Sequence, residues 1–127
     1  MGRKRRVRSL VVDGTEYRWC FGHRWDPVRG YPGSRSTVTL WRPEGVARLR
    51  LVFRPTTDRH IADGFFDEGA AVRLPDRAYV NLHEPGNVRA LFEEAMARGL
   101  FPQSGQAEAD GWPLFDALRP QPAPAVP

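Results

Sequence analysis

Residues 7–21 read VRSLVVDGTEYRWCF, two β-favouring runs separated by an Asp-Gly pair. Asp-Gly is preferred in two-residue hairpin turns because both positions tolerate a positive φ. This turn sets the register of the hairpin and places Leu10 opposite Tyr17. Two residues further from the turn, Arg8 faces Trp19 on the same side. That side buries more apolar area, so it is expected to face the core, with the guanidinium of Arg8 across the indole ring.

The same register extends the hairpin beyond Arg8. It pairs Arg6 with Phe21 and puts Cys20 on the opposite side, where a small core residue is favoured over a nucleophile because no local feature would activate the thiol. Arg6 is therefore expected to be a strand residue, and only residues 1–5 form a free basic arm.

Positive charge is concentrated at the amino terminus. Five of the first eight residues are cations, whereas the rest of the chain sums to minus one. Residues 9–60 hold nine arginines against five acids, and residues 61–127 hold five against ten. The amino-terminal half is thus a candidate surface for anions. Arginine outnumbers lysine eighteen to one, which is typical of GC-rich coding DNA and offers a non-functional source for part of the excess.

A second hairpin is expected from residues 37–42 and 47–54. A four-residue connection pairs Leu40 with Leu49 and leaves Trp41 opposite Arg48 on the other face; a three-residue connection would mix apolar and charged residues. The four-residue register also brings Arg50 to the face of Trp41. The sequence therefore predicts a polar sheet face bearing one tryptophan and several arginines.

The segments beside these hairpins contain turn signals. Residues 22–35 include Asp-Pro and Tyr-Pro-Gly, which indicate an irregular exposed loop. Residues 55–69 form a long connection, expected to be a surface loop pinned by Phe65 and Phe66. Extended runs at 71–74 and 78–82 favour a third hairpin.

An amphipathic helix is expected at about residues 86–98, where apolar residues recur at helical spacing. Either Glu84-Pro85 or Asn87 marks its start, and Gly99 marks its end. One helix on one face of an antiparallel sheet of about four to six hairpin strands is an α+β fold. A short edge strand is also allowed near Leu114.

The domain organisation follows from these elements. Residues 1–5 form the basic arm, residues 6–118 a single α+β domain, and residues 119–127 a proline-rich tail not expected to fold alone. No apolar stretch has the length of a signal peptide or a membrane span, and a single cysteine excludes an internal disulfide; a cytoplasmic location is expected.

Two motifs resemble segments of a known group of proteins. They are the hairpin stretch DGTEYRW at residues 13–19 and the helix end RGLFP at residues 98–102. Together they resemble a group of short bacterial proteins from GC-rich genomes that has no assigned activity. The resemblance implies no functional residue.

No catalytic or metal motif is found. The histidines His23, His60 and His83 lack partners at metal-binding spacing, and glycine-rich phosphate loops are absent. An acidic cluster at residues 58–68 lacks the spacing of an EF-hand and favours a solvated loop. We therefore expect a binding protein rather than an enzyme, without a cofactor, metal, small-molecule substrate or membrane partner.

Two classes of partner remain open. A protein-binding adaptor or accessory subunit of a bacterial complex is favoured, with Phe65, Phe66 and Trp112 as interface candidates, because interfaces are enriched in aromatic residues. The alternative is a protein that binds the backbone of RNA or DNA. Its candidate contacts are Arg3, Lys4, Arg5, Arg6, Arg8, Trp41, Arg48 and Arg50.

Overall fold

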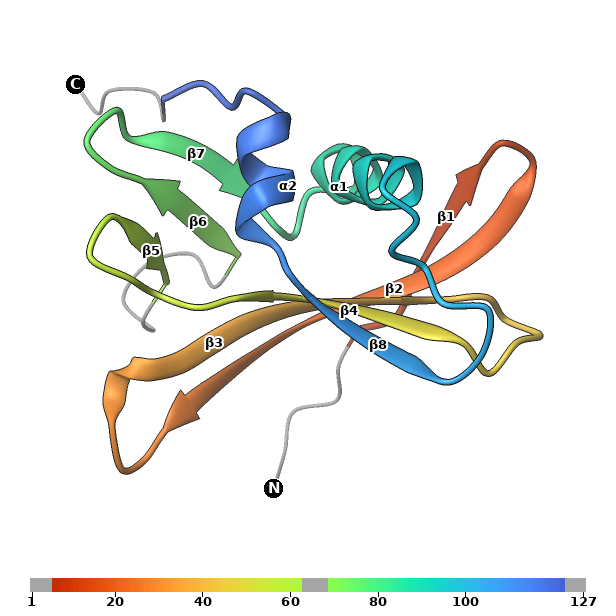
Figure 1. Cartoon of the computed structure of the whole chain (residues 1–127), viewed down its shortest axis with the longest axis horizontal. Coiled ribbons are helices and arrows are strands. Elements are labelled where there is room, and N and C mark those ends of the chain that lie inside the picture. The colour runs from red at the N-terminus through yellow and green to blue at the C-terminus, as the bar shows by residue number, and fades with distance from the viewer. Residues whose placement is uncertain (1–5, 63–68, 123–127) are drawn as a thin grey trace.

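The larger of two β-sheets organises the molecule (Figure 1). The computed structural model describes residues 6–62 and 69–122. The larger sheet has the strand order β1-β2-β3-β4-β8. Its strands are β1 (Arg8–Val12), β2 (Thr15–Asp26), β3 (Gly30–Trp41), β4 (Arg48–Phe53) and β8 (Gln106–Asp110).

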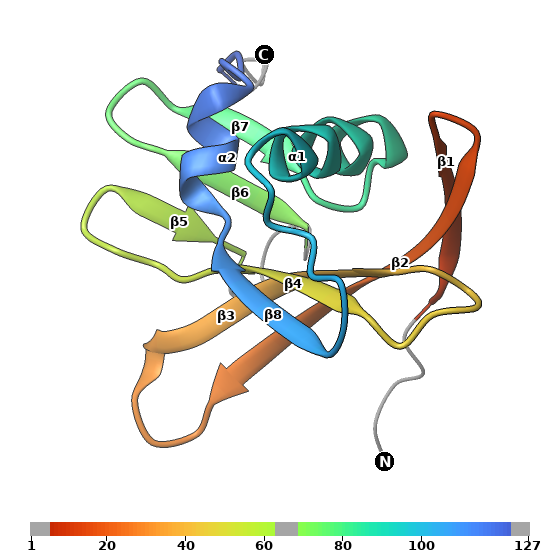
Figure 2. The same ribbon diagram turned by 45° about the vertical axis from the view of Figure 1, so that its right-hand side comes forward.

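Within the described ranges, a smaller sheet and two helices complete the α+β fold. The smaller sheet has the order β5-β6-β7. Its strands are β5 (Arg59–Ile61), β6 (Ala70–Arg73) and β7 (Ala78–Asn81), and the helices are α1 (Pro85–Ala97) and α2 (Trp112–Ala117). Figures 1 and 2 show the smaller sheet and both helices on the same side of the larger sheet.

Both predicted hairpin registers are confirmed. Leu10 pairs with Tyr17 in the first hairpin. Leu40 pairs with Leu49 and Trp41 with Arg48 in the second. The expected pairing of Arg6 with Phe21 is wrong, because β1 begins only at Arg8. The third hairpin is also present, as β6 and β7.

The loop predicted for residues 22–35 is instead the end of a long β2–β3 hairpin. Asp26 makes the tight turn, because its carboxylate accepts hydrogen bonds from the backbone N–H groups of Val28 (2.8 Å) and Arg29 (2.9 Å). At the adjacent bulge, the Ser34 hydroxyl takes the place of backbone hydrogen bonds between the strands. It accepts a hydrogen bond from the N–H of Asp26 and donates one to the carbonyl of Gly30. Side-chain hydrogen bonds thus stabilise a turn that composition alone assigned to a loop.

The carboxyl-terminal part also differs from expectation. The edge strand is β8, which pairs with β4 in parallel, so the sheet is not wholly antiparallel. A parallel pair needs a long crossover, and here the smaller sheet and α1 supply it. The segment at Leu114, expected to be a strand, is the second helix α2, with Pro113 in its first turn.

Helix α1 begins and ends close to the predicted positions. It starts at Pro85, with Glu84 as its extended N-cap, and ends before Gly99, whose φ is +69°. The N–H of Leu100 bonds the carbonyl of Ala95 at 3.0 Å, so the positive φ of the glycine lets the chain turn back on the last helical turn.

The core lies between the larger sheet and the elements on one side of it. Tyr17 is buried there and meets the ring of Phe92 on α1 at 4.6 Å between centroids. Phe53 and Trp112 contact each other edge to face at 5.2 Å, which joins β4 to α2. The buried apolar residues of the larger sheet therefore share one face and leave the other to polar side chains.

Candidate functional site

One face of the larger sheet is left uncovered by the described elements, as Figures 1 and 2 show. Strand alternation assigns its side chains, because residues two apart point the same way. We call it the open face. Its residues are Ser9 and Val11 on β1, Glu16, Arg18, Cys20, Gly22 and Arg24 on β2, Arg35, Thr37, Thr39 and Trp41 on β3, Arg48, Arg50 and Val52 on β4, Arg54 after β4, and Gln106, Glu108 and Asp110 on β8.

Long side chains on this face cover short ones. Cys20, Thr39 and Val52 are buried, although Cys20 and Val52 do not belong to the core cluster. Arginine stems bury apolar area while the guanidinium stays in water. Cys20 was expected to be a small core residue; it is buried, but the core position is wrong, because it lies on the open face across the sheet from the core cluster.

Trp41 and Arg48 form the aromatic end of the open face. The guanidinium carbon of Arg48 lies 4.9 Å from the centre of the Trp41 ring, and the two residues are cross-strand neighbours. Arg18 is the neighbour of Trp41 on the other side and lies 3.5 Å from the carboxylate of Glu16. This end thus presents a half-buried aromatic ring between two arginines.

Glu108 is the main acid near the middle of the open face. It lies 3.8 Å from the guanidinium of Arg50 and 3.7 Å from that of Arg54. All three side chains are between 39% and 55% exposed, so each ion pair contributes little and is screened by salt. An anionic ligand can therefore compete with Glu108 for both arginines.

Two arginines face each other at the far end. Arg24 on β2 and Arg35 on β3 are direct cross-strand partners. Like charges directly opposite on a sheet are destabilising. Within residues 6–62 and 69–122 neither guanidinium makes an ion pair. The pKa of Asp26 is lowered first by the backbone N–H groups of Arg29 and Val28, and the charge of Arg24 is the last of its causes.

A hollow of about 190 Å³ lies beside this arginine pair. The floor of the hollow is formed by Gly22 on β2 and its cross-strand partner Thr37 on β3, because glycine has no side chain and threonine has a short one. Arg24 and Arg35 stand on one side of this floor and Arg50 on the other. The residues lining the hollow are Gly22, His23, Arg24, Arg35, Thr37 and Arg50.

The amino-terminal arginines are placed differently from Trp41. Arg8 lies at the edge of the covered face, with its guanidinium 5.3 Å from the Trp19 ring and donating to the carbonyl of His83 at 3.0 Å. Arg6 is exposed and precedes β1. Arg3, Lys4 and Arg5 lie outside the described residues. The structure thus separates Arg8 and Trp19 from the face of Trp41.

Of the three aromatic residues expected at a protein interface, Trp112 lies within the described residues. Trp112 is 6% exposed and its indole N–H donates to the carbonyl of Arg54 at 2.8 Å, so its side chain offers little surface to a partner. Phe65 and Phe66 lie outside the described residues. Exposed apolar side chains occur instead at the tip of the β2–β3 hairpin, where Trp25 is 51% and Val28 is 91% exposed.

The histidines do not form a reactive cluster. His83 packs against Phe21 at 4.4 Å, His60 stacks with Tyr31 at 6.4 Å, and His23 lies 3.3 Å from the hydroxyl of Ser36. Among the described residues no three His, Cys, Asp or Glu side chains could hold a metal ion. No helix in the described ranges is long and apolar enough to cross a membrane.

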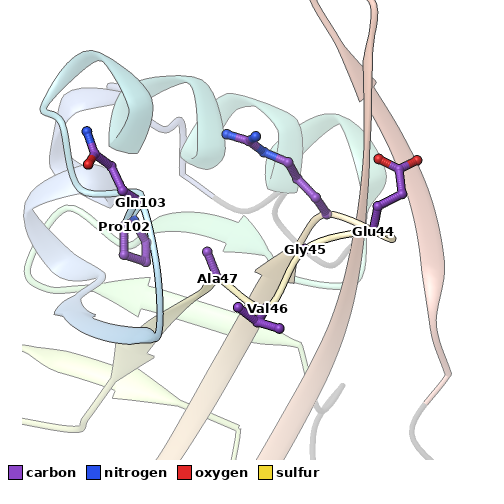
Figure 3. Close-up of a pocket in the computed structure, with 7 residues that line it drawn as sticks. Glu44, Gly45, Val46, Ala47, Pro102 and Gln103 are labelled. Atoms are coloured by element: carbon purple, nitrogen blue, oxygen red, sulfur yellow. The ribbon is translucent and has the colours of Figure 1, made fainter.

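A second hollow of about 310 Å³ lies where the β3–β4 connection meets the segment after α1 (Figure 3). It contains one cation, Arg42, and one acid, Glu44, so it offers no net charge to an anion. The guanidinium of Arg42 also lies over the Phe101 ring at 5.6 Å. Packing at this end of the sheet accounts for these contacts, and we assign the hollow no ligand.

The sequence placed Trp41, Arg48 and Arg50 on one sheet face but did not single out Arg24 and Arg35. The alternation of Arg18, Cys20, Gly22 and Arg24 along β2 was the available signal. Comparison with known proteins adds nothing to this assignment, because no protein-family model, curated protein or solved structure matches the chain.

Proposed function

We propose that this protein is a non-catalytic module that binds the backbone of a single-stranded nucleic acid on its open face. One observation carries the proposal: six arginines outnumber three carboxylates on the one face of the larger sheet that no described element covers. Guanidinium groups bind phosphates through paired, charge-assisted hydrogen bonds. The clustering of these arginines on one face argues against genomic bias alone, which would scatter them.

The shape of the face favours a single strand. An extended sheet can follow a flexible backbone, and exposed aromatic rings stack on unpaired bases with little regard to sequence. Trp41 is the aromatic candidate, between Arg18 and Arg48. No described helix projects from this side to enter a groove of duplex DNA.

Fluorescence anisotropy with labelled oligothymidylate, oligouridylate and duplex DNA at two salt concentrations tests the proposal. The R48A/R50A variant should bind the single strands at least about tenfold more weakly. The slope of log K against log salt should also fall by about 1.4, since each lost phosphate contact contributes about 0.7.

A matched control removes the same charge elsewhere. R89A/R98A changes Arg89 on α1 and Arg98 at its C-cap, each paired with a glutamate of α1 on the covered side of the sheet. This variant should bind as the wild type does. Absence of wild-type binding at low salt, or an equal loss in both double variants, would overturn the proposal. Deleting residues 1–5 from each protein measures the contribution of the basic arm separately.

A protein-binding adaptor is the second candidate, supported by the exposed Trp25 and Val28 at the β2–β3 tip. Exposed aromatic residues are enriched at interfaces. Affinity purification from the native cell with wild type and W25A/V28S tests it. A stoichiometric protein that the variant fails to retain would support this candidate over the nucleic-acid proposal, provided that the oligonucleotides do not bind.

A further inference from the structure

We propose that the hollow between Arg24, Arg35 and Arg50 is a seat for one phosphate group. This inference rests on the proposed function and deepens it, because it states which part of the open face receives the backbone charge. Three features of the hollow support it: the arrangement of the cations, the shape between them and the available hydrogen-bond donors.

The first feature is the placement of three arginines around the hollow. Arg24 and Arg35 are opposed across β2 and β3 without an ion pair among the described residues, an arrangement that costs the folded protein stability. An anion bound to both guanidinium groups removes that repulsion. Arg50 also lines the hollow, and among the described residues its ion-pair partner is the half-exposed Glu108 at 3.8 Å. Three guanidinium groups can therefore converge on one dianion at little cost to the fold.

The second feature is the shape of the hollow, which two small residues leave open. On strands β2 and β3, the row between Arg50 and the arginine pair consists of Gly22 and Thr37. A larger side chain at either position would fill the space that the two residues leave. The hollow of about 190 Å³ has room for a phosphate group and a few water molecules, since one water occupies about 30 Å³ in the liquid.

The donors around the hollow suit a phosphate better than a chloride or a lone carboxylate. Each guanidinium presents several N–H groups in a planar fork, and the Thr37 hydroxyl adds a donor at the floor. A tetrahedral group with three or four oxygens can accept from all of them at once. A carboxylate has only two oxygens and would leave donors unused.

Amide chemical-shift titration tests the seat directly, with inorganic phosphate, thymidine 5′-monophosphate and uncharged thymidine as ligands. Phosphate and the monophosphate should shift the amides of Gly22, Arg24, Arg35 and Thr37, and thymidine should not. These arms separate free phosphate from a nucleotide-borne phosphate, because a preference for the monophosphate shows that the adjoining sugar or base is also bound.

Three variants sharpen the test. R24A/R35A should weaken phosphate binding at least about tenfold. Gly22→Val should do the same without changing charge, because a β-branched residue suits a strand and its side chain fills the floor. Arg29→Ala, which removes a cation from the exposed turn of the same hairpin, should bind phosphate as the wild type does. Dispersed amide spectra in each variant confirm the fold.

The outcomes distinguish the seat from the proposed function. Equal phosphate binding by wild type, R24A/R35A and G22V overturns the seat. Oligonucleotide binding with phosphate shifts elsewhere overturns the seat and leaves the proposed function standing. Phosphate shifts at the four amides without oligonucleotide binding support the seat and overturn the proposed function.

Discussion

The two faces of the larger sheet are built from the same strands, yet they meet different requirements. On β3, Val38 and Leu40 point into the core and are fully buried, while Thr39 and Trp41 alternate with them on the open face. The covered face is apolar and in contact with α1, α2 and the smaller sheet. The open face is cationic and contains paired like charges.

This difference separates stability from binding. Apolar burial on the covered face supplies the main favourable free energy of folding. The repulsion between Arg24 and Arg35 on the open face opposes folding and favours an anion. Substitutions on the covered face should therefore change stability without changing the affinity of the folded protein. Substitutions of the open-face arginines should change affinity strongly and stability only slightly.

The largest effect is expected from Phe53→Ala. Phe53 is fully buried on β4 and packs edge to face against Trp112. Truncation leaves a cavity between the larger sheet and α2, and should lower the free energy of unfolding by about 3–5 kcal/mol. Urea unfolding measures the change. A loss below about 1 kcal/mol would show that α2 does not depend on this contact.

Gly111→Ala is the next largest, because it overfills the same contact. A Cβ atom at position 111 would lie no more than 2.6 Å from three ring carbons of Phe53, which is fully buried and has no free end to move. We expect a loss of about 2–3 kcal/mol in urea unfolding. Gly99→Ala is an informative comparison, since nothing lies near its added Cβ and only the positive φ of +69° is strained.

Asp116→Asn should have an intermediate, pH-dependent effect. The carboxylate joins α2 to the smaller sheet, accepting hydrogen bonds from Arg59 and Arg73. The Arg59 guanidinium, followed by that of Arg73, holds the pKa of Asp116 below its usual value, against the effect of burial. A lowered pKa in the folded state stabilises the protein above the unfolded pKa, near 3.9, and this contribution is lost as the pH falls through the folded value.

The size and pH dependence of that effect can be measured together. At neutral pH, D116N should lose about 1–2 kcal/mol, a modest value because the Asp116 side chain is 41% exposed. The difference in thermal stability from the wild type should shrink towards about pH 2. Glu93→Gln, at the exposed Arg89–Glu93 pair on α1, serves as the control and should change stability little. A pH-independent difference would contradict this role for Asp116.

Local signals account for what the sequence predicted correctly. The Asp-Gly turn determines the register of the β1–β2 hairpin, and strict alternation of apolar and polar residues determines that of the β3–β4 hairpin. The same alternation is sufficient to place Trp41, Arg48 and Arg50 on one face. Helix α1 was predictable because thirteen residues carry a clear apolar stripe bounded by a proline and Gly99.

Tertiary contacts account for what the sequence did not predict. Strand β8 reads Gln-Ala-Glu-Ala-Asp, which has little β propensity, and forms because β4 offers an edge. Helix α2 has six residues, too few to show a helical period. Trp112 is buried against Phe53, and its indole N–H donates to the carbonyl of Arg54, 58 residues away. Arg24 and Arg35 were missed because the proline- and glycine-rich segment around them is typical of a loop.

The smallest effect on stability is expected from Arg24→Ala and Arg35→Ala, and its sign is the sharpest test of the contrast between the faces. Removing either arginine relieves a directly opposed pair of like charges, so each variant should unfold at equal or slightly higher urea concentration, by up to about 0.5 kcal/mol. The double variant should gain no more than a single one, because one substitution already removes the repulsion. Added phosphate should stabilise the wild type more than either variant, since only the wild type has both guanidinium groups to bind it. A clear loss of stability in both single variants without phosphate would mean that the two arginines stabilise the sheet. The pair would then no longer support anion binding on the open face.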